Sequence, residues 1–147
     1  MMERTPPTFT ERRIRQIFDQ DKLLSLLGIE LVDGRAGYVV LRYTVTNDVV
    51  QEHGTCHGGV IFSLADAACG IAASGDDFPA VTQMCSINFL KPVPVGAVLR
   101  ATAIERSRTG RTVILDVTVV DSEGNTVAEL RGTARSVRKR VFEKDMV

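Results

Sequence analysis

The chain has 147 residues, which is enough for one compact domain with a hydrophobic core and too few for two ordinary domains. Its 18 basic and 18 acidic residues cancel, so there is no overall positive charge to attract nucleic acid. No uncharged apolar run approaches the roughly 20 residues of a membrane-spanning helix. We therefore expect neither nucleic acid nor a membrane as a partner.

The three cysteines, Cys56, Cys69 and Cys85, form an odd set without C-x-x-C spacing. This pattern argues against a disulfide framework and favours a reducing compartment. The first residues contain no apolar segment of the kind found in a signal peptide. We therefore expect a cytoplasmic protein, in which Cys69 and Cys85 are inert core residues within apolar runs.

Residues 1–22 are predicted to form an N-terminal arm and helix. The first eight residues contain two prolines and little to bury. Apolar residues at helical spacing follow as far as Leu27, and Gly28 is expected to end this region. Thr10 and Asp21 are candidate N-cap residues. Residues 23–147 are predicted to form a single domain.

Most of the remaining chain has the pattern of β-strands. Residues 38–46 alternate between two faces, and the pattern is β throughout after Pro79. Gly96, Gly110 and Gly124 recur at an even spacing between strand-length runs. Evenly spaced glycine turns between alternating runs predict an antiparallel meander.

One segment, residues 59–74, is apolar nearly all round and therefore predicts a buried helix. The last predicted strand has small residues on one face, including Ala128, Gly132 and Ala134, so that this helix could approach it closely. We predict an α+β fold in which a long central apolar helix is wrapped by a curved antiparallel sheet of about five strands.

Asp66 lies in the middle of this apolar helix. Aspartate is a poor residue for a helix interior, and an unpaired buried carboxylate is costly. No Lys or Arg occurs between Tyr43 and Leu90 to neutralise it. Two interpretations remain open: a carboxylate at a wet edge with structural hydrogen bonds, or a desolvated carboxylate that acts as a general base or nucleophile.

The helix begins at His57-Gly58-Gly59. The first turn of a helix leaves backbone N–H groups unpaired at the positive end of the dipole. Glycines let a substrate approach this backbone closely. The segment could therefore supply an oxyanion hole for acyl transfer, or it could be a flexible helix start beside a packed histidine.

Helix geometry constrains how these two features can cooperate. Gly58 and Asp66 are eight residues apart, which is roughly 12 Å along a helix. Asp66 cannot reach a carbonyl held at its own helix start. If both groups serve one site, they come from different subunits related by a two-fold axis, and the protein is an obligate homodimer.

The stretch GTCHGGVIFSLADAA, Gly54 to Ala68, resembles the PaaI type of hotdog-fold acyl-CoA thioesterases of phenylacetate degradation. LGIELVDGRAGYVVLRYTV before it and INFLKPVPVG after it extend the resemblance over about residues 23 to 137. It implies a hotdog fold, hydrolysis of an aryl-acetyl-CoA or medium-chain acyl-CoA to free acid and coenzyme A, no cofactor, and dimers paired into tetramers.

The resemblance also implies roles for single residues. Asp66 matches the catalytic carboxylate, Gly58 the amide donor to the thioester oxygen, and His57 the histidine that orients this region. Thr82 falls where the family often has a hydroxyl beside the carboxylate and its water. Gln51 stands where the family commonly has asparagine, a departure that puts its role in placing water or thioester in doubt.

The family holds coenzyme A along the strand after Thr82 and at a later hairpin turn. The corresponding residues here are Phe89, Lys91, Pro92, Arg108, Gly110, Arg111 and Thr112. Phosphate groups bind cations and exposed amides, so these residue types fit the role. Arg108 and Arg111 fit equally well as ordinary hairpin charges.

The sequence also bears on three other chemistries. His53, Cys56 and His57 lack a further ligand cluster, so we expect no metal. Ser63 and Cys69 have no basic neighbour in sequence, so a covalent serine or cysteine mechanism is not expected. A hydratase or dehydratase acting on enoyl-CoA or hydroxyacyl-CoA is the second hypothesis, because such enzymes pair a histidine with a carboxylate.

A non-catalytic acyl-CoA sensor is the third hypothesis. Sensors of this fold tend to carry an added DNA-binding segment. The N-terminal region contains Arg12, Arg13 and Arg15 but is too short for a helix-turn-helix.

Overall fold

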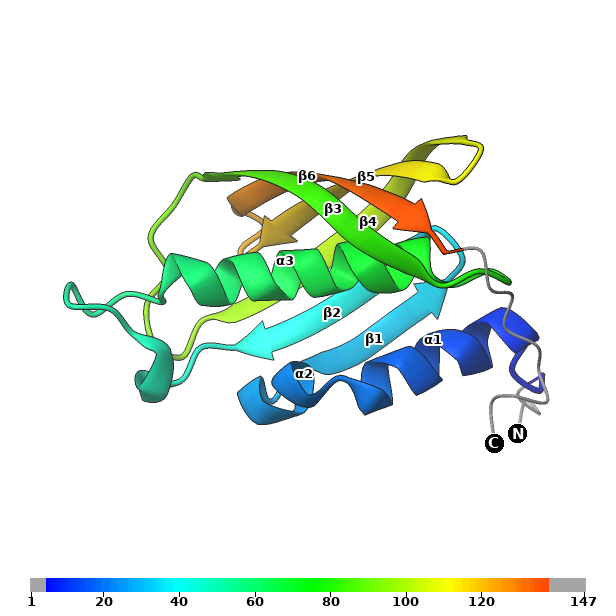
Figure 1. Ribbon diagram of the computed structural model, residues 1–147. Helices are drawn as coiled ribbons and strands as arrows, with labels where there is room; N and C mark the ends of the chain where they lie inside the picture. The colour runs from blue at the N-terminus through cyan, green and yellow to red at the C-terminus, as the bar shows by residue number, and fades with distance from the viewer. Residues whose placement is uncertain (1–4, 138–147) are drawn as a thin grey trace.

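The computed structural model describes residues 5–137 and shows a long helix held against a six-stranded sheet (Figure 1). The elements are α1 (Phe9–Gln20), α2 (Lys22–Leu27), β1 (Glu30–Arg35), β2 (Tyr38–Thr44), the 3-10 turn η1 (Asn47–Val49), α3 (Gly58–Ala73), β3 (Ala80–Phe89), β4 (Val98–Thr109), β5 (Thr112–Val120) and β6 (Thr126–Ser136). Residues 1–4 of the expected arm and residues 138–147 of the expected domain lie outside the described part.

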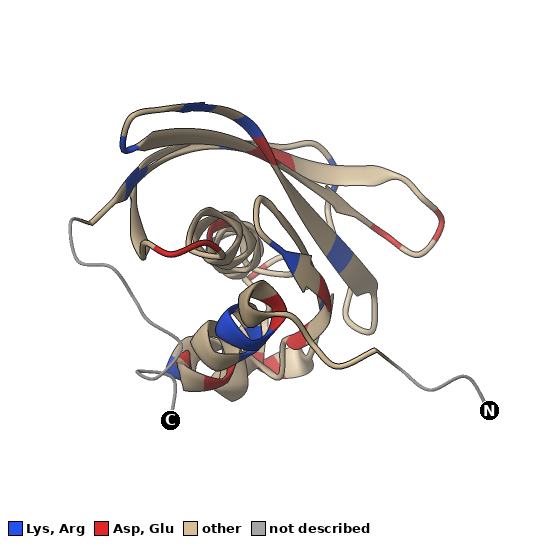
Figure 2. Cartoon of the chain, turned by 90° about the vertical axis from the view of Figure 1, so that its right-hand side faces the viewer, with Lys and Arg blue, Asp and Glu red and all other residues tan. Residues whose placement is uncertain are grey.

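The sheet is antiparallel throughout, in the order β1-β2-β4-β5-β6-β3. It curls around α3, which runs through the middle of the curve (Figure 2). The predicted α+β architecture is confirmed, with six strands in place of about five. Half of the residues of α3 are fully buried, as its apolar composition predicts.

The small-residue face of β6 lets α3 come close to the sheet. Ala128 and Ala134 are fully buried. A Cβ atom added at Gly132 would lie 2.5 Å from the Sγ atom of Cys69 on α3. Only a residue without a side chain fits at this position while the helix stays where it is.

The N-terminal helices begin and end at capping residues. The Thr8 side chain accepts the N–H of Glu11, and the Glu11 carboxylate accepts the N–H of Thr8 at 2.6 Å. The prediction of Thr10 as the N-cap of α1 is therefore wrong, because Thr8 is followed by the glutamate that completes a capping box. Asp21 caps α2 as predicted, and Gly28 ends it in the left-handed conformation.

β3 contains a β-bulge that decides which side chains face α3. Its register against β6 shifts between Thr82 and Met84, which leaves Gln83 as an extra residue. Residues three apart in a regular strand point to opposite faces. Because of the bulge, Thr82 and Cys85 are both partly buried on the α3 side, whereas Gln83 and Met84 are exposed.

β3 is also an edge strand, since it pairs with β6 on one side only within residues 5–137. Its large apolar side chains Val81, Met84 and Phe89 are more than half exposed. None of the helices in the described range is long and apolar enough to cross a membrane.

Candidate active site

The start of α3 is held by its own N-cap residue. The Nδ1 atom of the His57 side chain accepts the N–H of Gly59 at 2.9 Å. The backbone N–H of His57 donates to the carbonyl of Val49 at 2.8 Å. The N–H of Gly58 has no acceptor within residues 5–137. It is therefore a free donor at the positive end of the helix dipole.

A pocket of about 350 Å³ opens beside this donor. It is lined by Gln51, Thr55, Cys56, Gly58, Ile61, Phe89, Leu90, Lys91, Pro92 and Val93. The ring of Phe89 covers the helix start, because a Cβ atom at Gly58 would lie 3.3 Å from its Cζ atom. The structure thus brings five of the predicted site residues, Gln51, Gly58, Phe89, Lys91 and Pro92, into one pocket.

Gln51 forms part of the wall of this pocket. Its side-chain amide donates to the Oγ1 atom of Thr55 at 2.9 Å, and its backbone N–H donates to the Thr55 carbonyl, also at 2.9 Å. The amide nitrogen is therefore engaged by the loop itself. The longer side chain that departs from the family pattern folds back on its own turn.

Lys91 stands at the same pocket and is paired with Asp121. The Nζ atom of Lys91 lies 2.6 Å from Oδ2 of Asp121. This contact, with further hydrogen bonds from Asn125 and from the Glu123 backbone, lowers the pKa of the Asp121 carboxyl well below its ordinary value. Lys91 is held in place by this pair, and part of its charge is already balanced.

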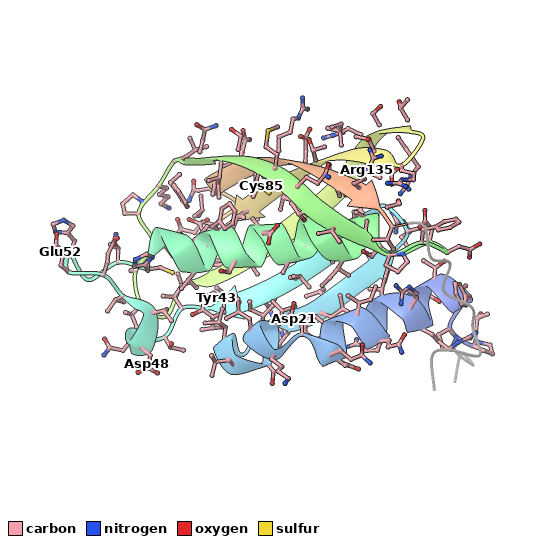
Figure 3. All side chains as sticks on the ribbon, in the orientation of Figure 1. Asp21, Tyr43, Asp48, Glu52, Cys85 and Arg135 are labelled. Atoms are coloured by element: carbon pink, nitrogen blue, oxygen red, sulfur yellow. The ribbon has the colours of Figure 1, made fainter. Side chains whose placement is uncertain are left out.

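Asp66 lies midway along α3 and is half-buried in the single chain. It forms no ion pair within residues 5–137. Its Oδ1 atom lies 3.7 Å from the Sγ atom of Cys85 on β3. Figure 3 labels Cys85 on this strand. One turn further along the helix, the Oγ1 atom of Thr82 lies 3.5 Å from the position of a Cβ at Gly70. Asp66, Cys85 and Thr82 therefore share one side of α3.

Both cysteines belong to the core or its edge, as predicted. Cys69 is fully buried, and Cys85 is partly buried, packs against the core and also contacts Asp66. Sequence reasoning missed Cys85 because the bulge in β3, and not strict alternation, turns it toward α3. The consecutive exposed positions Gln83 and Met84 mark the bulge in the structure, but the residue types alone do not reveal it, because Met84 is apolar.

The second predicted coenzyme A segment lies elsewhere. Gly110 turns the β4–β5 hairpin that carries Arg108, Arg111 and Thr112. Arg108 binds Glu105 through two 3.0 Å hydrogen bonds, and its Nη1 atom lies 3.3 Å from Oδ2 of Asp76, just after α3. The hairpin thus lies at the C-terminal end of α3, opposite the Gly58 pocket (Figure 1).

No group of three His, Cys, Asp or Glu side chains within residues 5–137 is arranged to hold a metal ion.

Sequence comparison identifies the family of this chain. The sequence model of the Thioesterase superfamily matches residues 53–128. Acyl-coenzyme A thioesterase PaaI of Escherichia coli is 35% identical over 82% of this chain and 86% of its own length. The chain belongs to the thioesterase superfamily.

Solved structures of other proteins resemble this thioesterase closely. The E. coli PaaI protein superposes with a TM-score of 0.87 at 31% identity, covering 91% of this chain and 97% of that protein. A Streptococcus mutans protein bound to acetyl CoA superposes with a TM-score of 0.74 at 30% identity, covering 77% of this chain and 91% of that protein. A hypothetical thioesterase of Streptococcus pneumoniae, solved with coenzyme A, gives a TM-score of 0.73 at 28% identity and also covers 77% of this chain and 91% of that protein. The family and fold inferred from the helix motif are confirmed.

Proposed function

We propose that this thioesterase hydrolyses an acyl-CoA in two equivalent sites of a homodimer. In each site, the Gly58 amide of one subunit binds the thioester oxygen and Asp66 of the other subunit activates water. The observation that carries the proposal is the separation of the two groups, roughly 12 Å along α3. The E. coli relative named as an acyl-CoA thioesterase, and the streptococcal relatives solved with acetyl CoA and coenzyme A, support this substrate class.

The edge of β3 is the expected contact between the subunits. An edge strand with unpaired backbone groups and exposed apolar side chains, here Val81, Met84 and Phe89, is a template for pairing with another chain. A two-fold axis beside β3 would run the two α3 helices antiparallel. The β4–β5 hairpin of one subunit would then approach the Gly58 pocket of the other. Both predicted coenzyme A segments would meet in one site.

The chemistry follows from these groups. The free Gly58 N–H stabilises the charge that develops on the carbonyl oxygen. A water held by Thr82 attacks the carbonyl carbon and transfers its proton to Asp66. The tetrahedral intermediate then collapses, the C–S bond breaks, and coenzyme A leaves as the thiolate. Direct attack by Asp66, through a mixed anhydride, would use the same residues.

The remaining residues have supporting roles in this proposal. His57 holds the helix start so that Gly58 presents its N–H, and Gln51 closes the pocket wall. Lys91 in the pocket, with Arg108 and Arg111 on the partner's hairpin, would bind the phosphates of coenzyme A.

Variants of a relative support the pairing of Asp66 with Thr82. The S. pneumoniae thioesterase has been solved with an aspartate replaced by alanine and with a threonine replaced by alanine. The two substituted positions are 16 residues apart in that protein, and Asp66 and Thr82 are the same distance apart here.

The proposal has three further parts. The acyl group is aryl-acetyl or medium-chain, two dimers pair into a tetramer, and the protein is cytoplasmic. The E. coli PaaI structure is described as a product of the phenylacetic acid degradation operon, which favours the aryl-acetyl group. Thiol release measured over aromatic and aliphatic acyl-CoAs would identify the acyl group.

The amide of Gly58 can be removed without disturbing the helix. Gly58 is the first residue of α3, where proline is favoured, and His57 before it is extended with ψ 131°. Gly58→Pro deletes the N–H, whereas Gly58→Ala keeps it and adds a similar contact to Phe89. We expect thiol release to fall about 100-fold or more in Gly58→Pro, by analogy with loss of an oxyanion-hole donor, and far less in Gly58→Ala.

Mixing two inactive variants tests the composite site. Asp66→Asn should lose most turnover while the protein stays folded. A mixed dimer of Asp66→Asn and Gly58→Pro subunits has one site with both lesions and one with neither. Random pairing should therefore restore about a quarter of the wild-type activity. A mixture that exchanges subunits but stays inactive would show that both groups come from one chain.

A further inference from the structure

Cys85 contacts the proposed catalytic carboxylate and has no role in the mechanism above. Its Sγ atom lies 3.7 Å from Oδ1 of Asp66 in a partly buried setting. Within residues 5–137 it is the single side chain that forms a hydrogen bond with the Asp66 carboxylate. The second oxygen, Oδ2, has no such partner there.

The Cys85 thiol is protonated at neutral pH. Burial raises its pKa to about 11, and the nearby Asp66 carboxylate contributes to the rise. Cys69, the other thiol on this side of α3, has its pKa raised to about 12, mainly by burial and less by Cys85, Asp66 and Asp116. A thiol that keeps its hydrogen is a donor and a poor nucleophile.

Two features of the fold fix the position of this donor. The bulge between Thr82 and Met84 turns Cys85 toward α3. In the register of the sheet Cys85 lies opposite Gly132, where an added Cβ would lie 3.6 Å from its Sγ atom. The missing side chain at Gly132 leaves the space that both thiols occupy.

We propose that Cys85 is a positioning residue for Asp66: its S–H donates to Oδ1 and so turns Oδ2 toward the water held by Thr82. This inference rests on the proposed function. The same contact would hold the Asp66 carboxylate in the orientation that proton transfer requires.

The test compares three substitutions at Cys85. Cys85→Ser keeps a donor, Cys85→Ala removes it, and Cys85→Val removes it while filling the space. We expect kcat to fall roughly fivefold in both apolar variants, with KM within about twofold of the wild type. Cys85→Ser should keep the kcat of the wild type, because its hydroxyl can still donate to Oδ1 of Asp66.

Ile87→Val is the matched control, because Ile87 is the next partly buried residue on β3 and forms no hydrogen bond with Asp66. It should leave kcat and KM close to those of the wild type. A wild-type kcat in Cys85→Ala and Cys85→Val would overturn the inference, as would a Cys85→Ser enzyme no better than Cys85→Ala. Full turnover in Asp66→Asn would instead overturn the proposed function itself, so the two failures are distinguishable.

Discussion

The contact between α3 and β6 predicts a specific packing defect. In Gly132→Ala, the new Cβ atom would lie 2.5 Å from Sγ of Cys69, whereas ordinary contact begins at 3.4 Å. One of the two must therefore move by about 0.9 Å, from 2.5 to 3.4 Å. Both residues are buried, so neither can turn into solvent.

The size of the effect follows from this overlap. Overpacking a well-packed core costs about 1–3 kcal/mol, and alanine recovers part of this because it restricts the unfolded chain. We expect Gly132→Ala to lower the free energy of unfolding by about 2 kcal/mol. For a chain of this size the melting temperature should then fall by roughly 4–8 °C.

A double-mutant cycle with Cys69→Ala checks the cause. Removing Sγ leaves space for the new methyl group, so the double variant should be about as stable as Cys69→Ala alone, a coupling of roughly 2 kcal/mol. Urea unfolding at one fixed protomer concentration measures all four proteins. Additive effects, or a Gly132→Ala protein as stable as the wild type, would refute the packing argument.

Three further predictions follow from caps, ion pairs and edges. His57→Ala removes the acceptor that caps α3 and should lower the unfolding free energy by about 1 kcal/mol in urea melts, with His57→Asn restoring most of it. The depressed pKa of Asp121 stabilises the fold fully above about pH 4, the ordinary carboxyl range, and this contribution is lost as the pH falls below it. Asp121→Asn should therefore be less stable than the wild type at pH 7, and the difference should shrink in unfolding measured below pH 4. Met84→Lys places a charge on the exposed side of β3, at the proposed contact between subunits, and should shift the protein toward monomers. Light scattering should then show a lower mass, and thiol release should fall as dimers are lost. An unchanged mass would argue against a subunit contact along β3.

The main architecture is predictable because it depends on the pattern of apolar residues and glycines, which can be read directly from the sequence. Residues 59–74 are apolar all round, which requires burial, and Gly110 and Gly124 adopt the positive φ angles of turns. Asp66 is recognisable from the sequence because it is a carboxylate within an apolar helix and has no Lys or Arg nearby in the sequence. The capping box of α1 is also visible in the sequence, because Thr8 precedes Glu11 by three residues.

Other parts of the site were beyond sequence reasoning for a physical reason. The contact of Cys85 with Asp66 depends on a one-residue change of register in β3, which leaves the composition of the strand unchanged. Lys91 precedes β4 and Arg108 lies near its end, so the length of this strand separates them. The dimer stays a prediction from helix length, because no single chain can contain both halves of the site.

The bulge at Gln83 has a consequence for how this strand can change over evolution. It divides β3 into two parts whose inward positions are even-numbered before it, as at Thr82, and odd-numbered after it, as at Cys85. Deleting Gln83 would remove the bulge and leave Thr82 and Cys85 two residues apart in a regular strand, so the hydroxyl and the thiol would still both face the helix. The strand can therefore lose the extra residue at this point without reversing its inward face, whereas a deletion within a regular part of β3 would reverse every position beyond it.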